Sequence, residues 1–158
     1  MSFHRRVDPI RLMAVRLGQG ELKHITQNPN VHEALRVSIY YHDDRAPGSV
    51  ATVRRGIGNE CPVQVAYDKL PEPVYFDLTI PAQRYHNLLM ALRRSQFDSL
   101  DDQEEVPYMG VDLWLVERIA GSFYHDIILA PGSAGGNHRE VMIAIKKLLP
   151  ESVRQGVH

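Results

Sequence analysis

Residues 132–138 form the segment whose residue types and position are best suited to ligand chemistry. The segment follows an expected strand and precedes an expected helix. Its free backbone N–H groups and the positive end of the helix dipole would therefore suit a phosphate or a carboxylate. The candidate anion site comprises Gly132, Ser133, Gly135, Gly136, Asn137 and His138.

The same segment also has a purely structural explanation. It matches neither GxGxxG nor GxxxxGK(S/T), and the strand before it is expected to be antiparallel, which the dinucleotide fold does not use. Asn137 would equally suit a simple helix cap, with the glycines acting as a flexible connection. Both interpretations stay open. The sequence contains no cofactor motif, so we expect no cofactor.

Glu117 is the best candidate for acid or base chemistry. The hairpin register adopted below places its carboxylate at the end of an apolar face, near Phe123 and His125, where burial would raise its pKa. Alternatively, such a residue lies beyond the core and pairs with an arginine. Ser133 lacks the GxSxG surroundings of a nucleophile elbow, and Cys61 has no adjacent base in the sequence. No catalytic residue is assigned.

The eight histidines do not show the HxxxH or HxH spacing of a metal site. A metal site would have to be assembled from distant segments, for example His42 with Asp43 or Asp44, and His125 with Asp126. A neutral histidine hydrogen-bonded to a neighbour is the simpler explanation for His125. We therefore expect no bound metal.

The composition is that of an ordinary globular chain. A length of 158 residues with 44% hydrophobic and 23% charged residues suits one domain with a substantial core. Because Cys61 is the only cysteine, no internal disulfide can form, which agrees with a reducing cytoplasm. No segment has the pattern of a signal peptide or a membrane span. We therefore expect a soluble cytoplasmic protein without membrane contact.

The charge pattern argues against a nucleic-acid partner. A formal net charge of −1 provides no overall field that would attract a polyanion. The local exceptions are three arginine pairs, at residues 5–6, 54–55 and 93–94. Such pairs are usually solvated surface, and the sequence does not show whether they converge.

Hydrophobic periodicity predicts four strands followed by a helix. Alternating apolar and polar residues indicate strands near residues 35–41, 50–55, 63–67 and 74–80, in an antiparallel meander. The period changes at Pro81, and a helix is predicted from there to about Phe97. A second main helix is predicted over residues 138–149, ending at Pro150.

The first thirty residues are less regular. Asp8-Pro9 and Gly18 favour a short helix between them, although the alternation from Arg11 to Leu17 would also allow a strand. Residues 18–33 indicate a polar loop, with a short extended piece at residues 22–25.

Residues 110–129 give the clearest pattern, which is a β-hairpin. A two-residue turn at Ala120-Gly121 would mix core and polar side chains on both faces. A three-residue loop at residues 119–121 instead places Gly121 where the backbone needs a positive φ, and it separates the two kinds of side chain. We therefore predict the three-residue loop.

This register gives the hairpin one apolar face and one mixed face. The apolar face holds Val111, Leu113, Leu115, Glu117, Phe123, His125, Ile127 and Leu129. The mixed face holds Asp112, Trp114, Val116, Arg118, Tyr124, Asp126 and Ile128, with Trp114 opposite Asp126. Because Trp, Tyr and Arg are enriched in protein interfaces, the predicted binding face is Trp114, Arg118, Tyr124 and Asp126. Alternatively, another part of the chain, such as the N-terminal helix, covers these residues.

The sequence thus predicts a single α+β domain over residues 1–150. It has an antiparallel sheet of about five or six strands with two main helices packed on one face, and residues 151–158 form a frayed C-terminal tail. The leading functional hypothesis is a non-enzymatic interaction module whose hairpin face binds a protein partner or a second copy in a homo-oligomer. The alternative is an enzyme or ligand-binding protein that holds an anionic small molecule at residues 132–138.

Overall fold

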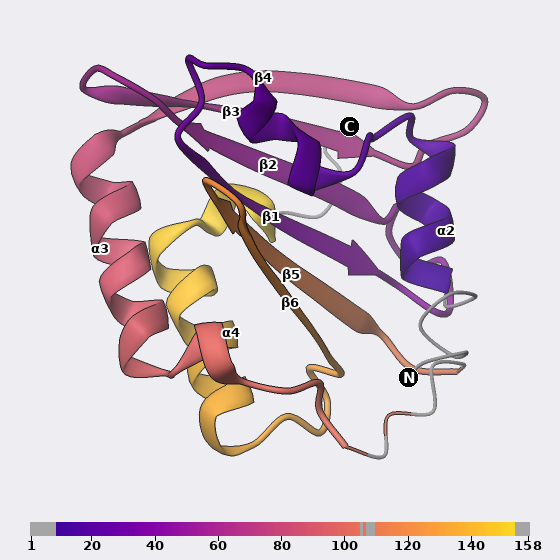
Figure 1. Ribbon diagram of the computed structural model, residues 1–158. Helices are drawn as coiled ribbons and strands as arrows, with labels where there is room; N and C mark the ends of the chain where they lie inside the picture. Colours follow the sequence, from indigo (N-terminus) through magenta and orange to yellow (C-terminus); the bar gives the residue numbers. More distant parts are fainter. Residues whose placement is uncertain (1–8, 105, 107–109, 154–158) are drawn as a thin grey trace.

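The computed structural model describes residues 9–104, 106 and 110–153. Its framework is one antiparallel sheet of six strands in the order β4-β3-β2-β1-β5-β6 (Figure 1). The strands are β1 (Glu33–Tyr40), β2 (Ser49–Arg55), β3 (Glu60–Tyr67), β4 (Val74–Pro81), β5 (Leu113–Ala120) and β6 (Phe123–Leu129). The predicted α+β fold, the meander of the first four strands and the hairpin are confirmed.

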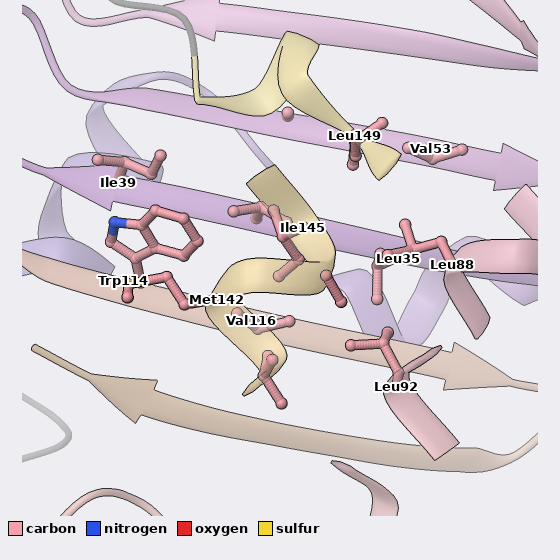
Figure 2. Close-up of a cluster of buried hydrophobic side chains, with 14 of the residues drawn as sticks. Leu35, Ile39, Val53, Leu88, Leu92, Trp114, Val116, Met142, Ile145 and Leu149 are labelled. Carbon is pink, nitrogen blue, oxygen red and sulfur yellow. The ribbon is translucent and has the colours of Figure 1, made fainter. Parts of the chain in front are cut away.

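One face of the sheet is covered by α3 (Ala82–Arg94) and α4 (Gly136–Leu148), which lie side by side (Figure 1). Leu88, Leu92 and Ile145 supply the apolar stripes of these helices, and they pack on the odd-numbered residues of β1 to β3. Each such buried aliphatic side chain contributes about 1.5–3 kcal/mol through removal from water. This interface is the main core (Figure 2).

The opposite face is covered by shorter elements. Helix α2 (Pro9–Arg16) packs Ile10 and Met13 against the middle of the sheet, and Leu17, directly after the helix, packs beside them. The 3-10 helix η1 (Leu22–Gln27) inserts Leu22 beside Ala34 of β1. The helix preferred for the N-terminal segment is confirmed, although Asp8 lies outside the described residues. The extended piece expected at residues 22–25 is wrong, because a helical turn is what brings Leu22 onto the sheet.

The predicted hairpin register is wrong. Ala120 pairs with Phe123, so the loop is Gly121-Ser122, and Gly121 has a φ of 59° at the first loop position, where type II′ turns place glycine. Trp114 therefore lies opposite Leu129 rather than Asp126. The observed faces of the hairpin differ from the predicted ones because α4 packs over both strands. Burial beneath α4 favours the register that puts the apolar residues of both strands on the same face.

This register separates the four residues of the predicted binding face. Trp114 and Arg118 lie on the face covered by α3 and α4, whereas Tyr124 and Asp126 lie on the opposite face. Trp114 is 4% exposed and packs among Ile39 and Met142 (Figure 2). The four residues therefore do not form one surface. Trp114 is covered by α4 of the same chain rather than by the N-terminal helix.

The C-terminal segment is more ordered than predicted. Pro150–Ser152 form the 3-10 helix η3, in which Glu151 and Ser152 are buried. Arg84 of α3 donates hydrogen bonds to both carboxylate oxygens of Glu151, at 2.7 and 2.8 Å. The frayed tail predicted to begin at residue 151 is therefore wrong for these residues, and residues 154–158 lie outside the described part of the chain.

The position of Trp114 predicts the cost of removing it. Trp114→Ala should lower the free energy of unfolding by about 3–5 kcal/mol, because it leaves a cavity beneath α4. The measurement is urea unfolding followed by circular dichroism. The control is Ile143→Ala on the 42% exposed side of α4, which should change stability by about 0.5 kcal/mol or less. A loss below about 1 kcal/mol for Trp114→Ala would contradict the core position.

Candidate functional site

A row of polar residues crosses the face of the sheet that carries α2 and η1. One member of each strand belongs to it, and neighbouring members are paired in the strand register. In strand order, the row is Asp77, Gln64, Thr52, Arg36, Glu117 and Asp126. Paired residues in neighbouring strands point to the same side of a sheet, so these side chains form a continuous polar line. The line runs between the apolar patches beneath α2 and η1.

Arg36 is the anchor of this row in the central strand β1. It is 6% exposed, its Nε donates to Thr52 Oγ1 at 2.9 Å, and its Nη1 donates to the carbonyl oxygen of Gly20 at 2.7 Å. Burial lowers the pKa of Arg36, while the nearby Glu117 acts in the opposite direction. The hydrogen bond to Gly20 fixes the segment between α2 and η1 above the row.

Glu117, Tyr124 and Asp126 form a hydrogen-bonded chain beside Arg36. Tyr124 Oη lies 2.6 Å from Glu117 Oε1 and 2.9 Å from Asp126 Oδ2. Arg11 of α2 donates from Nη2 to Asp126 Oδ2 at 2.8 Å. Glu117 is only 7% exposed, so its carboxyl group lies almost entirely out of water.

Two carboxyl groups share the single hydrogen of the Tyr124 phenol. Tyr124 Oη is the donor in both contacts, so its hydrogen is divided between Glu117 Oε1 and Asp126 Oδ2. Burial raises the pKa of Glu117, and the hydrogen bond from Tyr124 only partly offsets this. The raised pKa favours the protonated form of the Glu117 carboxyl group. Burial and the two acidic neighbours also raise the pKa of Tyr124, so the phenol stays protonated.

A hollow of about 340 Å³ opens above this chain. It lies at the small end of the volumes that ligand sites occupy. Its walls come from α2, η1 and the β5–β6 hairpin, and the lining residues are Arg11, Glu21, Leu22, Lys23, Glu117, Tyr124 and Asp126. Within the described residues, Glu117 Oε2 accepts no hydrogen bond. This oxygen can therefore accept one from a molecule in the hollow.

The predicted anion loop connects β6 to α4, as expected, and Gly132 at its start lines a pocket that Arg45 and Lys146 also line. Gly132, Ser133, Gly135, Gly136 and Asn137 are exposed, and a Cβ atom added to any of the three glycines would meet no other atom within 4 Å. The helix begins at Gly136, so Asn137 lies inside it and the predicted cap at Asn137 is wrong. His138 Nε2 lies 2.7 Å from the carbonyl oxygen of Asp101. Anion binding by this loop stays a prediction.

The metal grouping considered from the sequence forms only in part. His42, Asp43 and Asp112 place one ligand atom each within 4.8 Å of one another, whereas His125 hydrogen-bonds elsewhere, with Nε2 2.7 Å from the carbonyl oxygen of Leu100. Arg45 forms ion pairs with both carboxylates of the cluster. The Arg45 guanidinium, together with His42, holds the pKa of Asp112 at about 2. A metal ion would have to displace a bound guanidinium here.

The structure does not support either nucleophile candidate, Cys61 or Ser133. Cys61 is buried in the main core, and burial raises the pKa of its thiol, which disfavours a reactive thiolate. Ser133 is exposed, and its hydroxyl accepts a hydrogen bond from Gln103 Nε2 at 2.9 Å. Neither residue lines the hollow over Glu117.

Glu117 was the anomaly that the sequence revealed, but its neighbours differ from those predicted. In the structure, Tyr124 and Asp126 lie beside Glu117 instead of the predicted Phe123 and His125. Arg11 and Arg36 were not predicted to belong to any site. The signal that could have found Arg36 is its place opposite Glu117 on the same face of adjacent strands, which becomes visible only once the β1–β5 register is known.

Comparison with known proteins adds no assignment. Neither protein-family models nor curated proteins match this chain. Among the helices of the described residues, none has the length and apolar character needed to cross a bilayer. The site therefore has to be interpreted from its own geometry.

The buried Glu117 predicts a pH dependence of stability. Its pKa is raised above the ordinary value of 4.5, so the folded state holds a proton that the unfolded state releases. The stabilisation is complete below about pH 4.5 and is lost as pH rises through the raised pKa, by at most about 1.4 kcal/mol per pH unit. In Glu117→Gln, the side chain is a neutral amide and has no carboxyl proton to release. Urea unfolding from pH 4 to 8 should therefore show wild type losing stability relative to the variant; parallel curves would contradict the raised pKa.

Proposed function

We propose that the protein is a binding module for a small, uncharged polyhydroxyl compound, such as a sugar or a polyol, that occupies the hollow over Glu117. The observation that carries the proposal is the free Oε2 of a buried carboxyl group at the edge of a hollow of about 340 Å³. Because Tyr124 donates to Oε1, Oε2 is left as an acceptor that suits the hydroxyl group of a ligand.

The charges around the hollow favour a neutral ligand. Arg11 and Lys23 line it and Arg36 lies beside Glu117 in the neighbouring strand, so an ammonium group would meet charges of its own sign. Asp126 and Glu21 line it too, which disfavours a carboxylate or phosphate. Hydroxyl groups both donate and accept, so they can satisfy fixed groups of either sign without adding a charge.

This proposal keeps the class of binding module that the sequence favoured but moves its site. Tyr124 and Asp126 of the predicted binding face take part, whereas Trp114 belongs to the core. Leu22 supplies an apolar wall against which the carbon skeleton of a sugar could pack. A few fixed polar groups beside apolar surface are typical of small-molecule sites.

The test is a thermal-shift screen followed by isothermal titration calorimetry. The panel contains neutral sugars and polyols, with spermidine and citrate as charged comparators. A ligand at a hundred times its dissociation constant adds about 2.7 kcal/mol of stability, which such a screen detects. We expect a neutral hydroxyl compound to bind and both charged comparators to give no shift.

Glu117→Met tests the position of the site, because it keeps the side-chain length but removes both carboxyl oxygens. We expect at least a tenfold loss of affinity, about 1.4 kcal/mol. The matched control is Glu151→Gln, which alters a buried carboxylate on the other face of the sheet and should bind as wild type does. Equal binding by Glu117→Met and wild type, or no binding across the panel, would refute the proposal.

A further inference from the structure

The two edges of the sheet are protected to different degrees. At the β6 edge, Ile128 N donates to Asp102 Oδ1 and Gln103 N donates to the carbonyl oxygen of Ile128, each at 2.9 Å. Strand β4 forms the other edge, at the top of Figure 1. Among the described residues, no segment bonds to the outer side of β4. Its outward backbone groups are therefore available to another strand.

The side chains of β4 are unusually apolar for an open edge. Tyr75 is 48% exposed and Phe76 is 40% exposed, and they lie on opposite faces of the sheet. Val74, Phe76 and Leu78 alternate on the face of the main core, where they continue the rows of β3. Exposed aromatic groups on both sides of an open strand favour strand pairing over solvation.

The apolar pattern of β4 is symmetric about Phe76. We infer that β4 pairs antiparallel with β4 of a second copy, in a register centred on Phe76. A two-fold axis there places Phe76 opposite its own equivalent and Val74 opposite Leu78, which makes a continuous apolar row. On the other face, the hydroxyl-bearing Tyr75 lies opposite Asp77 of the second copy. The result is one sheet running through both copies.

Neighbouring registers are less favourable. A centre at Asp77 would place two carboxylates directly opposite each other, which is destabilising. A centre at Tyr75 would move Pro73 into the paired region, where it cannot donate to the ladder. The centre at Phe76 keeps residues 74–78 paired and leaves both Pro73 and Pro81 outside.

The first test is the mass of the full chain in solution, measured by analytical ultracentrifugation from 1 to 200 µM. Wild type should form a dimer, and Phe76→Lys, which would place two ammonium groups opposite each other, should raise the dissociation constant at least a hundredfold. The control is Ile143→Lys, at a site of similar exposure on α4, which should leave the dimer intact. Far-UV circular dichroism confirms folding of both variants. A wild-type monomer throughout, or an unchanged Phe76→Lys dimer, would overturn the inference.

The second test fixes the register. In Phe76→Cys, the two new thiols would face each other across the axis, at the Cα separation that a disulfide can bridge. Mild oxidation should link this variant into a covalent dimer. Wild type should stay uncrosslinked, because its Cys61 is buried. Linkage in Asp77→Cys instead of Phe76→Cys would overturn the register centred on Phe76.

Discussion

The buried guanidinium of Arg36 is the interaction on which the site depends. It lies in the central strand, out of water, and an unpaired charge there would cost several kcal/mol. Thr52 and the carbonyl oxygen of Gly20 supply its hydrogen bonds. Because Gly20 lies between α2 and η1, this contact fixes the segment that joins the two elements, while Met13 and Leu22 pack against the sheet on either side of it. Arg11 of α2 and Lys23 of η1 line the hollow above Glu117.

The two faces of the sheet differ in the residues they carry and in the elements that cover them. The face beneath α3 and α4 carries the main apolar core, which explains why the helices could be predicted from their periodicity. The other face is interrupted by one charged residue in each of β1, β5 and β6, where only short elements cover it. Short elements leave gaps, and the charged residues of β5 and β6, Glu117 and Asp126, line one of them. The main core and the candidate site therefore lie on opposite faces of the same sheet.

Local sequence patterns were sufficient to predict the strands and helices, but not the register in which the strands pair. The alternation around Val37 and Leu78 and the spacing of Leu88 and Leu92 are visible in any window of the chain, so these strands and helices were predicted. The β5–β6 register was not, because Gly121 fits two loop lengths and burial by α4 decides between them. Glu117 was recognised as unusual, but its neighbours follow from that register. Arg11 joins the site through the packing of α2, which no local pattern encodes.

A buried polar network often serves only to fix a fold, and replacing one with apolar residues is frequently neutral or stabilising. Such a network can be a simple link between packed elements, as between Arg84 of α3 and Glu151 of η3. The chain from Glu117 to Asp126 differs, because it borders a hollow and Glu117 Oε2 accepts no hydrogen bond from the described residues. A purely structural role requires neither the opening nor the free acceptor. Their combination is the physical reason for treating this face as the binding site.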